Sequence, residues 1–105
     1  MNYEEILELT NEQLDSEVAK ALGWKIEINE FLIYEYYDVN GKYRGYACNY
    51  RPSENWNPCG HLVLQCKNFM LTKGCVEWVA VVDTNIGTGD TPALAICRAF
   101  VLSKQ

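Results

Sequence analysis

Four residues between positions 51 and 56 combine groups that commonly bind ligands. Arg51 carries a planar fork of donors suited to phosphate or carboxylate, and Trp56 offers a ring on which a base can stack. Ser53 and Asn55 add two small polar groups between them. Because Trp and Arg are enriched at binding hot spots, the segment is a candidate binding turn. The alternative is a proline-bounded turn whose tryptophan fills the core.

A second candidate is the glycine-containing segment from Asn85 to Asp90, which precedes a predicted helix. Free N–H groups at a helix N-terminus attract phosphate or carboxylate. We therefore include Thr88, Gly89 and Thr91 among the predicted ligand-binding residues. Asp90 would repel an anion unless it points away, and the absence of a P-loop lysine argues against nucleotide hydrolysis. The alternative is a plain strand-to-helix turn in which Asp90 is the cap.

The sequence offers neither a catalytic constellation nor a metal site. His61 is the only histidine, and Cys59 lies across a glycine from it, which is poor geometry for a Cys-His pair. A zinc site needs four ligands, usually in closely spaced pairs, and Cys48 and Cys66 would join these two residues only by chance of folding. We therefore expect no catalytic residue, no cofactor and no bound metal.

Length and charge narrow the class of protein. A chain of 105 residues is one domain's worth. Its net charge is −5 and its nine Lys and Arg residues are scattered, which disfavours binding to nucleic-acid phosphates. The acidic start from Met1 to Leu9 does not resemble a signal peptide, and no apolar run is long enough for a membrane helix. We expect a cytoplasmic protein whose five cysteines, an odd number, are reduced thiols.

The elements that must position these residues follow from capping, periodicity and turn signals. A helix is predicted from Thr10 to Leu22, with Thr10 and Gln13 as a capping box and Gly23 ending it. The tyrosine-rich segments 26–37 and 43–50 are predicted to form a hairpin around Asn40-Gly41.

The second half of the chain is also predicted to contain both helices and strands. A short helix over 61–67, a strand pair over 69–72 and 75–83, the loop over 85–90 and a helix opened by Pro92 are expected. Apolar residues on both faces of 75–83 predict a central strand covered on both sides. This order indicates an α+β domain, with an antiparallel sheet of about four strands and three helices.

Three segments together resemble the phage ABA sandwich domain proteins and the related NinX-type proteins of temperate phages. These segments are Leu9–Asp15 running to Val18–Trp24, Tyr50–Trp56 leading to Gly60, and Gly89–Phe100. The resemblance implies a single domain over 1–105 with a three-layer α-β-α arrangement, and a phage or prophage gene. It implies no established reaction. The chain departs from the NinX pattern at Cys59 and His61, on either side of Gly60.

Together these observations predict a non-enzymatic phage accessory protein of the host bacterial cytoplasm. We expect it to bind a small anionic or nucleotide-like molecule, with sequestration of a host defence signal as the purpose. The alternative is a protein-interaction module that inhibits or redirects a host protein. The tyrosine-rich strands also favour a homodimer.

Overall fold

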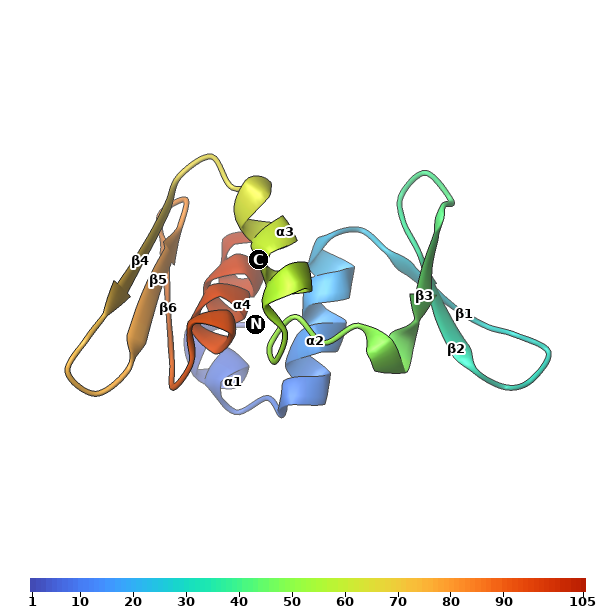
Figure 1. Ribbon diagram of the computed structural model, residues 1–105, viewed down its shortest axis with the longest axis horizontal. Coiled ribbons are helices and arrows are strands. Elements are labelled where there is room, and N and C mark those ends of the chain that lie inside the picture. Colours follow the sequence, from blue (N-terminus) through green and yellow to red (C-terminus); the bar gives the residue numbers. More distant parts are fainter.

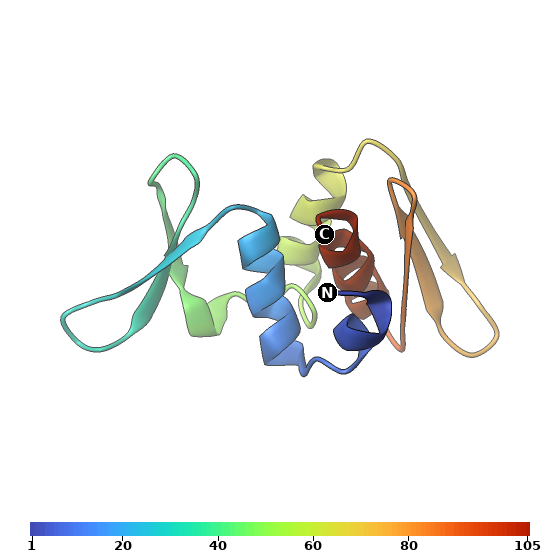
Figure 2. The ribbon, with the colours of Figure 1, turned by 180° about the vertical axis from the view of Figure 1, so that it is seen from behind.

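The computed structural model describes residues 1–105 and shows two antiparallel sheets with helices between them (Figures 1 and 2). The predicted α+β class is confirmed, whereas the three-layer α-β-α arrangement implied by the resemblance is not, because the helices lie between two sheets. The detail differs from the prediction, because the strands form two three-stranded sheets instead of one sheet of about four strands. Four α-helices are present instead of three, since the first, α1 (Tyr3–Leu7), was not predicted. None of the helices is long and apolar enough to cross a bilayer.

Helix α2 (Asn11–Ala21) begins and ends where the sequence predicts. The Thr10 side chain accepts the N–H of Gln13 at 3.2 Å, and the Gln13 side chain accepts the N–H of Thr10 at 2.9 Å. Gly23 has a φ of +79°, which glycine adopts without the strain of a side chain. The helix buries Leu14 and Val18, both at most 1% exposed, so it forms one side of the core.

The first sheet is built from β1 (Lys25–Ile28), β2 (Tyr34–Tyr37) and β3 (Tyr43–Tyr46), in that order. The predicted continuous strand over 26–37 is wrong, because a turn separates β1 from β2. Asn29 causes this turn: its side-chain oxygen accepts the N–H groups of Phe31 at 2.8 Å and Ile33 at 3.1 Å. The predicted hairpin between β2 and β3 is confirmed.

A short 3₁₀ helix, η1 (Ala47–Asn49), follows β3 where the sequence predicted a longer strand. Helix α3 (Trp56–Leu64) then begins five residues before the predicted start at 61. The helix starts earlier than predicted because its first turn accommodates Pro58. Pro58 is in fact the third helical residue, where its missing N–H has no intrahelical acceptor and costs nothing.

The second sheet contains β4 (Phe69–Lys73), β5 (Trp78–Val82) and β6 (Asn85–Gly89), with β5 in the centre as predicted. The prediction that β5 is covered on both sides is wrong, since helices lie on only one face of this sheet (Figure 1). On that face Ala80 and Val82 are at most 1% exposed. The opposite face carries Val79 and Val81, which are only partly covered.

Strand β6 replaces the predicted loop over 85–90. Glycine is rare in strands, and its two positions here concealed the strand in the sequence. Gly87 is required by packing: a Cβ at this position would lie 2.4 Å from both the carbonyl oxygen of Ala95 and the nitrogen of Ala99. The strand therefore lies directly on α4 (Pro92–Ser103), whose predicted start with Pro92 in the first turn is confirmed.

The core lies between α4, the covered face of β4–β6 and helices α1 to α3. Its 14 buried residues include Phe100 at 1% exposure and the thiols Cys59 and Cys97 at 0%. Cys97 is therefore a core residue. The sheet β1–β3 contributes none of these 14 residues, so it extends away from the core.

Candidate functional site

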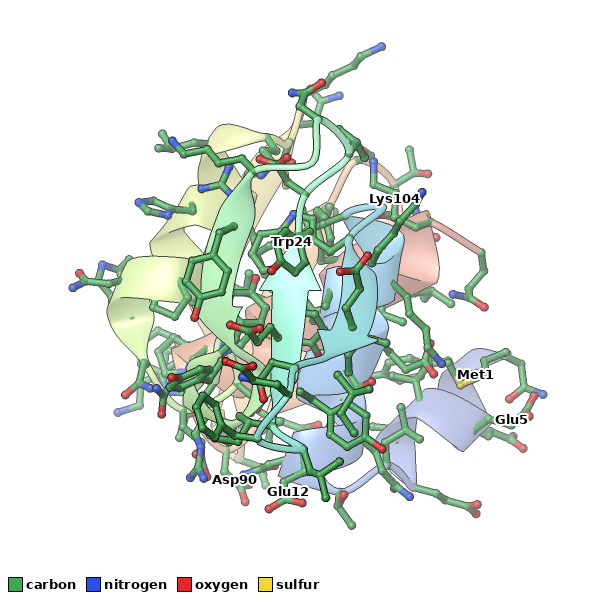
Figure 3. All side chains as sticks on the ribbon, turned by 90° about the vertical axis from the view of Figure 1, so that its right-hand side faces the viewer. Met1, Glu5, Glu12, Trp24, Asp90 and Lys104 are labelled. Carbon is green, nitrogen blue, oxygen red and sulfur yellow. The ribbon has the colours of Figure 1, made fainter.

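The predicted binding turn and the predicted helix-opening loop meet in one open pocket of about 650 Å³. The pocket lies between the start of α3 and the start of α4 and also contacts the start of α2. Its lining residues are Asn11, Ser53, Glu54, Trp56, Asp90, Thr91, Pro92, Ala93 and Leu94. Three predicted site residues, Ser53, Trp56 and Thr91, are thus brought together. In Figure 3, Asp90 and Glu12 are both labelled at the lower edge of the view, and Glu12 is the residue after the pocket residue Asn11.

Two helix N-termini open on this pocket. In α4 the Thr91 side chain accepts the N–H of Leu94 at 3.2 Å, while the N–H of Ala93 has no acceptor within the protein. In α3 the N–H of Trp56 is likewise without an acceptor, and the N-cap Asn55 makes no side-chain cap bond. Free N–H groups and the positive end of the helix dipole favour an anionic or carbonyl oxygen in such a place.

Ser53 adds an unsatisfied group to the pocket wall. The residue is only 4% exposed, and its hydroxyl has no hydrogen-bond partner. Its backbone N–H donates to the Asp15 carboxyl at 2.8 Å, while the hydroxyl lies near that carboxyl without forming a bond of good geometry. A buried polar group without a partner costs stability. Because this hydroxyl is fully buried beside Asp15, it belongs to the wall of the pocket and is not accessible to a ligand.

The pocket rim combines a large ring with two carboxylates. Trp56 is 59% exposed, although most large aromatic side chains bury themselves, so its ring is free to stack on a ligand. Glu54 accepts from the Asn11 amide and from Arg51, both at 3.4 Å. Asp90 is exposed. The carboxylates at the rim suit hydroxyl or amino donors, whereas the helix starts suit an anionic group.

The other predicted site residues lie outside this pocket. Arg51 donates to the Cys48 carbonyl at 3.0 Å and to Glu54 at 3.4 Å, and it lines a separate cavity of about 240 Å³ beside Asp15. The Thr88 hydroxyl bonds the Tyr3 hydroxyl at 2.7 Å. Asn55 is exposed next to the pocket as the N-cap of α3. Gly89 is buried under α4, where a Cβ would lie 3.0 Å from Ala95 N.

Several pocket residues were not predicted. Pro92, Ala93 and Leu94 form the first turn of α4, which the sequence did place correctly, so extending the site into that turn would have found them. Asn11 comes from α2, and no local signal connects it to a turn 42 residues later. Only the packing of α2 against α4 brings it to the pocket.

His61, whose role the sequence left open, is exposed on α3, whereas Cys59 is fully buried in the core. The two side chains therefore do not form one accessible site. The structure contains no group of three or more His, Cys, Asp or Glu side chains arranged to hold a metal ion.

Asp15 supports the pocket wall from behind, and burial raises the pKa of its carboxyl above the ordinary value of 3.8. The hydrogen bond from the Ser53 N–H opposes this rise. Between the ordinary and the raised pKa, the folded state therefore holds a proton at Asp15 that the unfolded chain has already released. The stability of the protein should fall as the pH rises from the ordinary value through the raised pKa, and should be flat above it.

Asp15→Asn is expected to remove this part of the pH dependence, because the amide oxygen still accepts the Ser53 N–H and carries no charge. Asp15→Ala, which leaves that buried N–H without an acceptor, should cost about 1–3 kcal/mol. Urea unfolding of the three proteins across the acidic to neutral range measures both effects. An unchanged pH slope in Asp15→Asn would show that this carboxyl does not titrate with folding.

Comparison with known proteins identifies the family. None of the curated proteins matches the chain at a significant level. The family described as "Bacteriophage P22, NinX" matches residues 5–104, and therefore almost the whole sequence. This match agrees with the resemblance carried by the three segments, and it supports a phage accessory protein without assigning an activity. The chain belongs to the bacteriophage P22 NinX family.

Proposed function

We propose that this phage protein is a non-enzymatic binder of a small nucleotide-like ligand, held in the pocket between the starts of α3 and α4. The observation that carries the proposal is the convergence of Ser53, Trp56 and Thr91 from two distant segments on one pocket. In this arrangement the ligand's ring stacks on Trp56, and its anionic group accepts from the N–H of Ala93 at the start of α4. Arg51 has no part in this contact, since it lines the other cavity.

The proposed biological role is the sequestration of a nucleotide signal in the host cytoplasm. Binding without turnover fits a pocket that has helix N-termini and a stacking ring but no histidine or cysteine among its lining residues. The two rim carboxylates favour a ligand with ribose hydroxyls or amino groups over a bare phosphate, because a bare phosphate would meet only like charge at the rim.

A thermal-shift screen of the protein against nucleoside monophosphates, cyclic dinucleotides and inorganic phosphate tests the proposal. We expect at least one nucleotide to raise the melting temperature and inorganic phosphate to have little effect. Trp56→Ala should reduce the shift, because it removes the stacking ring, and should leave the free protein about as stable because that ring is 59% exposed. A screen in which no nucleotide raises the melting temperature would contradict the proposal.

A second candidate function is a protein-interaction module that inhibits or redirects a host protein, and the open face of the sheet β4–β6 favours it. This face carries no charged side chain over its strands: the residues are Met70, Thr72, Val79, Val81, Ile86 and Thr88. Met70 is 63% exposed and Ile86 is 54% exposed. Uncharged apolar faces of this kind mark protein contacts. Capture of a host protein that Met70→Glu abolishes would support this function over ligand binding.

A further inference from the structure

The sheet β1–β3 exposes an unusual amount of apolar surface along one side. Five residues in and after β1 are exposed: Ile26 by 53%, Ile28 by 54%, Phe31 by 73%, Leu32 by 77% and Ile33 by 38%. β1 is also an edge strand, since it pairs only with β2. Figure 3 views the molecule from the side of this sheet, where no further strand borders β1.

The open edge of β1 presents unpaired backbone groups at defined positions. In the adjoining turn the N–H of Asn29 donates to the Ile33 carbonyl at 2.9 Å, which fixes the phase of the antiparallel ladder. Because hydrogen-bonded positions alternate along such a ladder, the backbone groups of Lys25 and Glu27 point toward β2. Those of Ile26 and Ile28 then point to the open edge, where another strand can reach them.

The side chains of β1 are complementary to a second copy of the same strand. We infer that two copies pair antiparallel through β1, with the two-fold axis at Ile26, to form one six-stranded sheet. In this register each Lys25 lies opposite Glu27 of the second copy, and Ile26 lies opposite Ile26. The two ion pairs occupy one face and the isoleucines the other, because side chains alternate along a strand.

Neighbouring registers of the pair formed by two copies of β1 are less favourable. A shift by one residue places Ile26 opposite Glu27, which mixes apolar and charged side chains on one face. A shift by two places Glu27 opposite Glu27 of the second copy, which is repulsive. A charge on an edge strand usually prevents pairing, but opposite charges two residues apart attract across a two-fold axis.

The other three sheet edges lack this complementarity. β3 is irregular, with a register shift in its pairing and a φ of +100° at Gly45. On β6 the N–H of Thr88 already donates to the Tyr3 hydroxyl at 2.7 Å. β4 carries a charge only at its last residue, Lys73, so it has no acidic partner for a second copy. The register and charge pattern therefore single out β1.

Sedimentation of the full chain at tens of micromolar, with charge-reversed variants, tests the inference. The wild type should sediment as a dimer. Lys25→Glu and Glu27→Lys should each weaken the dimer about tenfold or more, because like charges then face each other. An equimolar mixture of the two variants should form a heterodimer, since each restores the opposite charge for the other. The double variant Lys25→Glu, Glu27→Lys should recover self-association.

The side chains of Lys25 and Glu27 are exposed, so circular dichroism should show that the variants are folded. A monomeric wild type would overturn the inference and leave β1 free for a strand of another protein. Single variants that dimerise like the wild type would also overturn it, because the contact would then lie elsewhere. A mixture that stays monomeric would exclude the proposed register.

Discussion

Gly87→Val is expected to destabilise the protein by about 4 kcal/mol or more, or to prevent folding. The Cβ alone would lie 2.4 Å from the Ala95 oxygen and the Ala99 nitrogen, and 2.9 Å from the Ala99 Cα. These are backbone atoms in the middle of α4, so no side-chain rotation relieves the overlap. The strand β6 would have to leave α4, and the pocket residues at the end of β6 would move with it.

Gly60→Ala is the matched control for this variant. A Cβ at Gly60 meets nothing closer than the Trp56 ring at 3.9 Å, and the position is helical. Alanine loses less conformational entropy on folding than glycine, so this variant should be about 0.4–1 kcal/mol more stable than the wild type. Equilibrium unfolding in urea measures the stability of both variants. Equal stability of the two variants would show that β6 does not pack on α4 as described.

Phe100→Ala is expected to cost about 3–5 kcal/mol, the second largest effect. Phe100 is the largest fully buried side chain, at 1% exposure, and α4 carries it into the core shared by helices and sheet. Its removal leaves a cavity that the surrounding backbone cannot fill by small shifts. Unfolding curves would show the change as a lower urea midpoint with an unchanged slope.

Phe31→Ala provides the comparison at an exposed phenylalanine. Phe31 is 73% exposed in the turn between β1 and β2, so its removal should change stability by no more than about 0.5 kcal/mol. A similar loss in both variants would mean that the turn is packed against something in solution, as in a larger assembly. A small loss in both would contradict the position of Phe100 in the core.

Local signals in the sequence were enough to place the helices α2 and α4. Thr10 with Gln13, and Thr91 with Pro92, act within one turn of the helix they start, so the sequence contains the whole cause. The short α1 has a capping box of Asn2 and Glu5 as well. It is only five residues long, and its stability depends on burying Ile6 in the core, which no local pattern reveals.

The elements that the sequence misplaced depend on contacts between distant residues. Position 87 requires glycine because α4 leaves no room for a side chain beside this strand, and this contact cannot be deduced from the neighbouring residues in sequence. The turn at Asn29 is a local signal that the β-branched and aromatic residues around it obscured. The strands form two sheets, of which β1–β3 contributes no residue to the core, and no local signal in the sequence reveals this separation.

The candidate site, too, could be predicted from the sequence only in part. The chemistry of Ser53, Trp56 and Thr91 predicts a binding role, and the packing of α3 and α4 brings them to one pocket. The chemistry of Arg51 predicts the same role, but its guanidinium faces the Cys48 carbonyl and Glu54 on the other side of the turn. Residue type alone does not say on which side of a turn a side chain lies.

Calorimetric titration of the nucleotide that gives the largest thermal shift tests the pocket most directly. It should be run on the wild type, on Trp56→Ala and on Phe31→Ala as an exposed aromatic outside the pocket. Loss of the stacking ring should weaken binding by about 1–3 kcal/mol in Trp56→Ala, with little change in stability because the ring is 59% exposed. Phe31→Ala should bind like the wild type. Equal affinity of Trp56→Ala and the wild type would contradict the proposal that this pocket binds the ligand.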